Sequence, residues 1–135
     1  MRTPARFPIA AMLFATHAVS LAQACPRAAE VSQAHVLGTW HASIDGLPAA
    51  TLHLAKHPEY AGTLRGHLER GGRRFEIAGD VGDGELTLDE SDDGARISAA
   101  WLGDVVEGSC GREIRGVWKA EGAPEERPFV LRRLP

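Results

Sequence analysis

Histidines are the residues of this protein best suited to metal chemistry. If Ile44 pairs with Ala50 across a hairpin, His41 lies directly opposite His53 on the outer face of a two-stranded sheet. Two imidazoles at that spacing can hold Zn²⁺ or Cu²⁺ weakly. His67 is expected some distance along the next strand, so the sequence places no third ligand. We therefore expect an ordinary solvent-facing pair and no metal site.

Three tryptophans, Trp40, Trp101 and Trp118, and also Tyr60 lie at positions of the predicted strands whose side chains point into the barrel. Such rings can line a pocket for a small apolar ligand, with room left by inward glycines. These glycines are Gly62, Gly66, Gly79, Gly108 and Gly116. The same rings can instead fill the core, because a small eight-stranded barrel can be packed by its own side chains. Core filling is the simpler interpretation, and both stay open here.

No motif in the sequence specifies a reaction. Cys110 is expected to be oxidised, and the serines lack the Gly-x-Ser-x-Gly context of an activated nucleophile. The serines considered are Ser43, Ser91, Ser98 and Ser109. Neither a phosphate-binding loop nor a dinucleotide fingerprint occurs, and the acidic segment 89–94 does not match an EF-hand loop. We expect a protein that is not an enzyme and that uses no cofactor.

The elements that must position these residues are short strands. From Val36 onward, apolar residues recur at every second position and turn residues separate the runs, which is typical of half-buried antiparallel strands. No segment longer than about ten residues has a helical period, and the many glycines disfavour long helices. The first four strands are expected at about 36–44, 50–56, 60–70 and 73–81.

Turn signals fix the expected pairing of the strands. Gly71-Gly72 predicts a two-residue hairpin that sets Leu68 opposite Phe75. Gly82-Asp83 predicts another that sets Ile77 opposite Leu88, and the turn at 91–94 sets Leu88 opposite Ile97. Further turns are expected at Gly103-Asp104 and at 121–126.

These pairings keep one continuous apolar face, which predicts an all-β fold: an antiparallel meander closing into a small barrel of eight or nine strands. The pattern gives nine segments, and an odd number cannot close a purely antiparallel barrel. Either one segment, the short fifth or seventh, is not a strand, or the barrel is open.

Residues 1–24 have the parts of a secretory signal peptide. Two arginines precede an apolar run at 7–15, and the segment ends in Ala22-Gln23-Ala24. The apolar run is too short to span a membrane. Cleavage after Ala24 leaves a single domain at 25–135, in the periplasm or secreted.

The charge of the predicted mature domain excludes some partners. Two of the fifteen basic residues and none of the eighteen acidic ones lie in residues 1–24, so residues 25–135 carry a net charge of −5. That balance gives no general attraction to nucleic acid or to anionic lipid.

The two cysteines, Cys25 and Cys110, are expected to form a disulfide, because export places both in an oxidising compartment. Closing so long a loop contributes roughly 4–5 kcal/mol in the chain-entropy picture. The alternative is a lipidated Cys25, which would anchor the protein to a membrane. Ala22-Gln23-Ala24 fits the usual lipoprotein pattern poorly.

Gly38-Thr39-Trp40 on the first strand resembles the Gly-x-Trp signature of the calycins, the lipocalin and avidin-like small barrels. Segments 62–66, 107–110 and 114–118 are similar to the avidin branch. The resemblance implies a calycin-like barrel, and some avidins pair cysteines placed as Cys25 and Cys110 are. The biotin-binding residues of avidins do not line up with this sequence, so biotin is not expected as a ligand.

In lipocalins, an arginine near the end of the last strand packs over the first-strand tryptophan. The resemblance therefore implies that Arg133 packs over Trp40, beside Gly38, in a cation–π contact that closes one end of the barrel.

Two functions fit an exported, non-catalytic binding protein. The first is to carry or sense a small apolar ligand in the barrel, at Trp40, Trp101, Trp118 and Tyr60. The second is a periplasmic inhibitor or immunity-type protein that binds an envelope protein through its longer connections, at 45–49 and 121–126.

Overall fold

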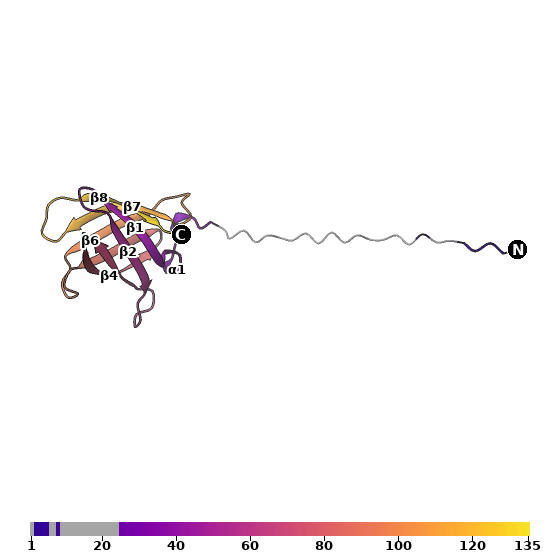
Figure 1. Ribbon diagram of the computed structural model, residues 1–135, viewed down its shortest axis with the longest axis horizontal. Coiled ribbons are helices and arrows are strands. Elements are labelled where there is room, and N and C mark those ends of the chain that lie inside the picture. Colours follow the sequence, from indigo (N-terminus) through magenta and orange to yellow (C-terminus); the bar gives the residue numbers. More distant parts are fainter. Residues whose placement is uncertain (1, 6–7, 9–24) are drawn as a thin grey trace.

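The period-two apolar pattern forms eight antiparallel strands that close into a barrel, each strand pairing with its sequence neighbours and β1 with β8 (Figure 1). The computed structural model describes residues 2–5, 8 and 25–135. The strands are β1 (Gly38–Ile44), β2 (Ala50–Lys56), β3 (Leu64–Arg70), β4 (Arg73–Gly82), β5 (Glu85–Ser91), β6 (Ala99–Val105), β7 (Glu113–Ala120) and β8 (Arg127–Arg133). The 3-10 helix η1 (Ala28–Glu30) and the helix α1 (Gln33–Val36) precede them. The all-β barrel predicted from the sequence is confirmed.

The predicted signal peptide at 1–24 falls almost wholly outside the described residues. Within the part of the protein that is described, no helix is both long and apolar enough to cross a membrane.

The predicted turn at Gly103-Asp104 is wrong, and this explains the ninth segment. Both residues lie inside β6, where Gly103 pairs with Leu86 on one side and Gly116 on the other. One continuous strand therefore replaces two short ones. The resulting even number lets the antiparallel ladder close.

The β3–β4 hairpin has the register that the sequence predicts, with Leu68 opposite Phe75. Its turn residues Gly71 and Gly72 have φ angles of 59° and 76°. A type I′ turn requires positive φ at both central positions, which two glycines adopt without strain.

The predicted β4–β5 pairing is wrong by two residues. The tip lies at Asp83-Gly84, with φ angles of 52° and 79°, instead of one position earlier. Ile77 therefore faces Glu90, not Leu88. Asp-Gly is a preferred type I′ pair because aspartate tolerates positive φ better than most residues and glycine adopts it freely.

The predicted pairing of β5 with β6 is also wrong. Leu88 faces Trp101, because β6 begins only at Ala99. Ile97 instead lies in the connecting loop at 92–98 and is half exposed.

The predicted pairing of Ile44 with Ala50 is wrong. Ala42 faces Ala50, and Ile44 pairs instead with Phe129 of β8, so the end of β1 leaves β2 and follows β8. His41 consequently lies opposite Thr51 and does not face His53.

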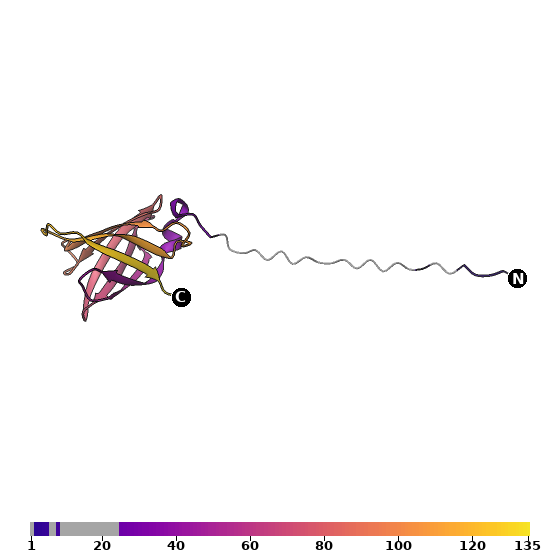
Figure 2. The ribbon, with the colours of Figure 1, turned by 90° about the horizontal axis from the view of Figure 1, so that it is seen from above.

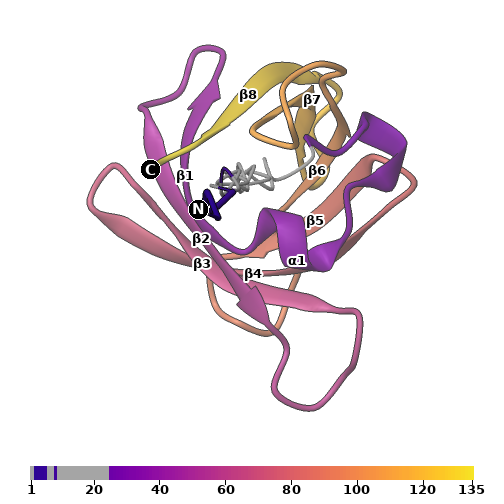
Figure 3. The ribbon, with the colours of Figure 1, turned by 90° about the vertical axis from the view of Figure 1, so that its right-hand side faces the viewer.

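Residues 25–37 cross one end of the barrel, which we call the capped end (Figures 2 and 3). The C-terminus of the protein lies at the same end. The other end, which carries the loops at 45–49, 71–72, 92–98 and 121–126, is called the open end.

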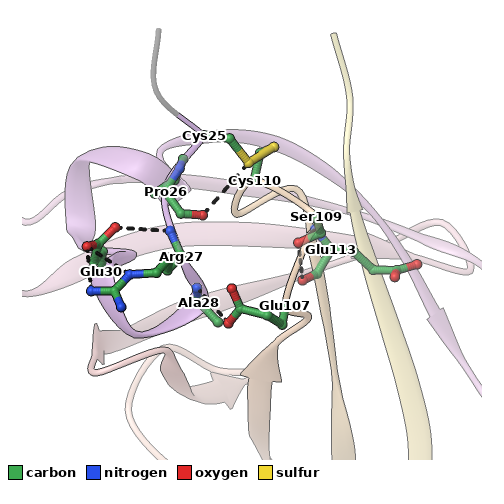
Figure 4. Close-up of a disulfide and its surroundings, with 9 residues drawn as sticks. All are labelled: Cys25, Pro26, Arg27, Ala28, Glu30, Glu107, Ser109, Cys110 and Glu113. Carbon is green, nitrogen blue, oxygen red and sulfur yellow. Dashed lines mark hydrogen bonds and ion pairs between the residues drawn. A yellow bond between two sulfur atoms is a disulfide. The ribbon is translucent and has the colours of Figure 1, made fainter.

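The predicted Cys25–Cys110 disulfide is present and fastens the capping segment to the loop after β6 (Figure 4). Nearby, the Ala28 backbone N–H donates to the Glu107 carboxylate at 3.2 Å. A lipid on the Cys25 thiol is incompatible with this bond, because both need the same sulfur. Such a disulfide is typical of an oxidising, extracytoplasmic compartment.

Large apolar side chains fill the interior. The largest fully buried ones are Trp40, Trp101, Phe129, Leu52, Leu64, Leu68, Ile77, Leu86, Leu88, Ile114 and Leu131. Two of the inward glycines do not leave room for a ligand, since a Cβ at Gly66 would lie 1.8 Å from the His53 carbonyl oxygen and one at Gly116 1.9 Å from that of Leu102. Glycine at these positions lets neighbouring strands approach closely.

Candidate functional site

A buried carboxylate lies inside the barrel toward its open end. Glu90 of β5 is only 1% exposed, because alternate residues of this strand point into the barrel and Glu90 follows Leu86 and Leu88 in that alternation. Its Oε2 accepts hydrogen bonds from the indole N–H groups of Trp101 and Trp118, both at 3.0 Å. The two tryptophans face each other across β6 and β7.

Arg70, the last residue of β3, supplies the opposite charge. Its Nη2 donates to Glu90 Oε1 at 2.6 Å. The guanidinium carbon lies 4.5 Å from the ring centre of Phe75 and 5.5 Å from that of Trp118, within cation–π range of both rings. Among the described residues no buried side-chain nitrogen or oxygen lacks a partner, so the charges and indole groups of this cluster are paired inside the barrel.

This cluster was missed in the sequence, although a signal existed. Glu90 and Arg70 both occupy strand positions at which the other residues are mostly apolar and buried. A charge at such a position is unusual, and two opposite charges there indicate a buried pair. The sequence does not show which charge on one strand meets which on another.

The four aromatic residues predicted to bind ligand do not form one site. Trp101 and Trp118 share Glu90, whereas Trp40 lies toward the capped end and donates its indole N–H to the Val36 carbonyl at 2.9 Å. Tyr60 lies in the loop between β2 and β3, 63% exposed, with its ring centre 4.7 Å from that of His57 and the two rings tilted by 42°. Trp118 is the member that reaches a pocket.

That pocket, the mouth pocket, opens at the surface of the open end and has a volume of about 270 Å³. Its lining is mostly apolar: Leu47, Trp118, Ala120, Ala123, Pro124, Glu125 and Arg127. Neither Trp40 nor Trp101 contributes to it or to four other surface pockets of the described residues. Of the four aromatic residues predicted to bind ligand, Trp118 alone lines this pocket.

The loop at 45–49 is fastened to the first residues of β8, which directly follow the loop at 121–126. The Asp45 backbone N–H donates to the Pro128 carbonyl at 2.9 Å, and Arg127 Nη1 donates to the Asp45 carbonyl at 3.1 Å. The loops at 45–49 and 121–126, predicted as contact points for a partner, line the same pocket through Leu47 and residues 123–125, so they border one surface.

Arg133 closes the capped end by hydrogen bonding. It pairs with Trp40 across β1 and β8, and its guanidinium donates to the backbone carbonyls of His35 and Leu37. A Cβ at Gly38 would lie 3.3 Å from Arg133 Nη2. Among the described residues, the cation–π contacts belong to Arg70 and Arg73, and the contact expected between Arg133 and Trp40 is not one of them.

Comparison with known proteins adds no family to this description. No protein-family model matches the sequence, and no curated protein sequence is significantly similar to it. The geometry of the barrel is therefore the basis for assigning a function.

Proposed function

We propose that this protein is an exported, non-catalytic binding protein that holds a small, largely apolar ligand at the open end of its barrel. The observation that carries this proposal is the mouth pocket, whose apolar lining includes Leu47 and the edge of Trp118. The predicted signal peptide and the Cys25–Cys110 disulfide support a periplasmic or secreted location.

The size of the mouth pocket restricts the ligand. Its volume of about 270 Å³ lies just below the range of about 300–1,000 Å³ that is typical of pockets for drug-sized molecules. The filled interior gives no deeper extension, so the ligand inserts one ring or one branched aliphatic group beside Trp118. Arg127 at the rim favours a polar or anionic end that stays in water.

Native mass spectrometry of the protein purified from its own host's envelope tests this proposal. The expected result is a disulfide-bonded polypeptide beginning at Cys25 that carries a small-molecule adduct. Ala123→Leu narrows the mouth pocket and should abolish the adduct, whereas Ala61→Leu, on an exposed loop between β2 and β3, should retain it. A wild-type protein free of small molecules would overturn the proposal.

A second function has its own supporting observation. Because the loops at 45–49 and 121–126 border one surface, a partner protein can contact both while inserting an apolar side chain into the mouth pocket. This arrangement suits a periplasmic inhibitor or immunity-type protein that acts through its loops. The same mass spectra distinguish the two functions, since this one requires a stoichiometric protein in place of the small molecule.

A further inference from the structure

Three possible metal ligands meet on the outer face of the barrel, on strands β2 and β3, which contribute no residue to the mouth pocket. His53 of β2 is paired directly with His67 of β3. Glu69 follows His67 by two positions, and alternate residues of a strand point to the same face. The observed β1–β2 register differs by two residues from the predicted one. His41 therefore lies outside this group, and Thr39 is the residue opposite His53.

The ligand atoms of these side chains are already close together. One atom from each of His53, His67 and Glu69 lies within 4.8 Å of the others. The imidazole ring centres are 4.5 Å apart, and His67 Nε2 lies 4.0 Å from Glu69 Oε1. Ligands of a tetrahedral Zn²⁺ are about 3.3 Å apart at the usual bond lengths, so small side-chain rotations suffice to bind an ion.

Thr39 orients one of the imidazoles. Its Oγ1 lies 3.1 Å from His53 Nδ1. In the tautomer that donates Nδ1–H to this oxygen, the lone pair of Nε2 is available to a metal. Histidines that bind metals commonly have their second ring nitrogen held by an oxygen in this manner.

Neighbouring charges do not block the cluster. Arg74 is the cross-strand partner of Glu69, and its Nε lies 3.5 Å from Glu76 Oε1, so that carboxylate offsets part of its charge. The His67 side chain is 27% exposed and that of Glu69 is 60% exposed. An ion can therefore reach the ligands from solvent and keep water at its remaining position.

We propose that His53, His67 and Glu69 form a divalent-cation site on the outside of the barrel, with Zn²⁺ as the ion that it takes. Two imidazoles and one carboxylate are a known ligand set for zinc, and the fourth position is left for water or for a donor from a partner. The bound ion would join β2 to β3. This site is independent of the function proposed for the mouth pocket.

Zinc titration of untagged, chelator-treated protein by isothermal calorimetry tests the site. One Zn²⁺ per protein molecule is expected, and His53→Gln or His67→Gln should each weaken binding by at least about tenfold. Thr39→Val should weaken it by about tenfold through loss of the orienting oxygen, and Glu69→Gln should also weaken it. His41→Gln is the matched control, because His41 lies on the outer face of β1 outside the cluster. This substitution should leave the zinc affinity unchanged.

Imidazole NMR resonances of the wild-type protein give a second measurement that needs no variant to fold. Zinc should shift the His53 and His67 signals and leave those of His41 and His57 in place. Absence of binding at millimolar zinc, or equal losses in the His41 and His67 variants, would overturn the proposal.

Discussion

Glu90 and Arg70 form a charge pair inside the open end of the barrel, with Arg70 Nη2 2.6 Å from Glu90 Oε1 and the Arg70 and Glu90 side chains 12% and 1% exposed. Burying two charges is costly, and the indole donors of Trp101 and Trp118 help to offset that cost. The pair therefore fixes the positions of both tryptophans, including the one that borders the mouth pocket.

Replacing one member of this pair should destabilise the fold strongly. Glu90→Gln leaves the Arg70 charge buried without its partner, and we expect a loss of about 3–5 kcal/mol. Urea unfolding followed by tryptophan fluorescence measures it. The double variant Glu90→Gln, Arg70→Met should recover much of the loss. Glu121→Gln, at an exposed site, is the control and should change stability by less than about 0.5 kcal/mol.

Removing the disulfide should loosen the capped end. The variant Cys25→Ser, Cys110→Ser opens a loop with a sequence separation of 85 residues, and we expect a loss of about 2–5 kcal/mol. Hydrogen exchange should speed up in residues 25–37 more than in β2–β5, since the bond joins the capping segment to the loop after β6 and involves none of these strands. Uniform acceleration over the whole barrel would contradict this local role.

Gly66 and Gly116, which lie inside strands, should tolerate no side chain. A Cβ at Gly66 or Gly116 meets a neighbouring carbonyl oxygen at 1.8 or 1.9 Å, so Gly66→Ala and Gly116→Ala should each cost about 1–3 kcal/mol or more. Gly82→Ala is the matched control in the same sheet, because its Cβ meets nothing within 4 Å. Thermal unfolding compares the melting temperatures of the three variants. Equal melting temperatures would contradict the prediction, because they would show that the strands move apart at little cost.

His67 should make the metal-free protein less stable in mild acid. Burial lowers the pKa of His67 below its usual 6.5, assisted by the charges of Arg74 and His53. Between the folded and unfolded pKa values, the unfolded state binds more protons, so stability falls as the pH drops below 6.5. His67→Gln should flatten this part of the pH profile, and an NMR titration should place the His67 midpoint below 6.5. A midpoint at or above that value would contradict the prediction.

The amino-acid pattern was enough to predict the fold class and to favour the disulfide over a lipidated Cys25. Strict alternation of apolar residues permits only strands with one buried face, and the two cysteines have no other partner in the protein. Gly71-Gly72 also determined one register, because two adjacent glycines at a hairpin tip define which residues flank the turn. The calycin resemblance stays a prediction.

The other registers could not be predicted from the amino-acid pattern and are set by the closed barrel. The incorrect pairings of β1 with β2, β4 with β5 and β5 with β6 all differ from the structure by an even number of residues. Such a slip leaves every side chain on its original face, so the apolar pattern cannot distinguish the alternatives. Closure of all eight strands into one ring selects among them, because each register must suit the stagger of the whole barrel. That selection places Glu90 beside Arg70, and His53 beside His67 instead of His41.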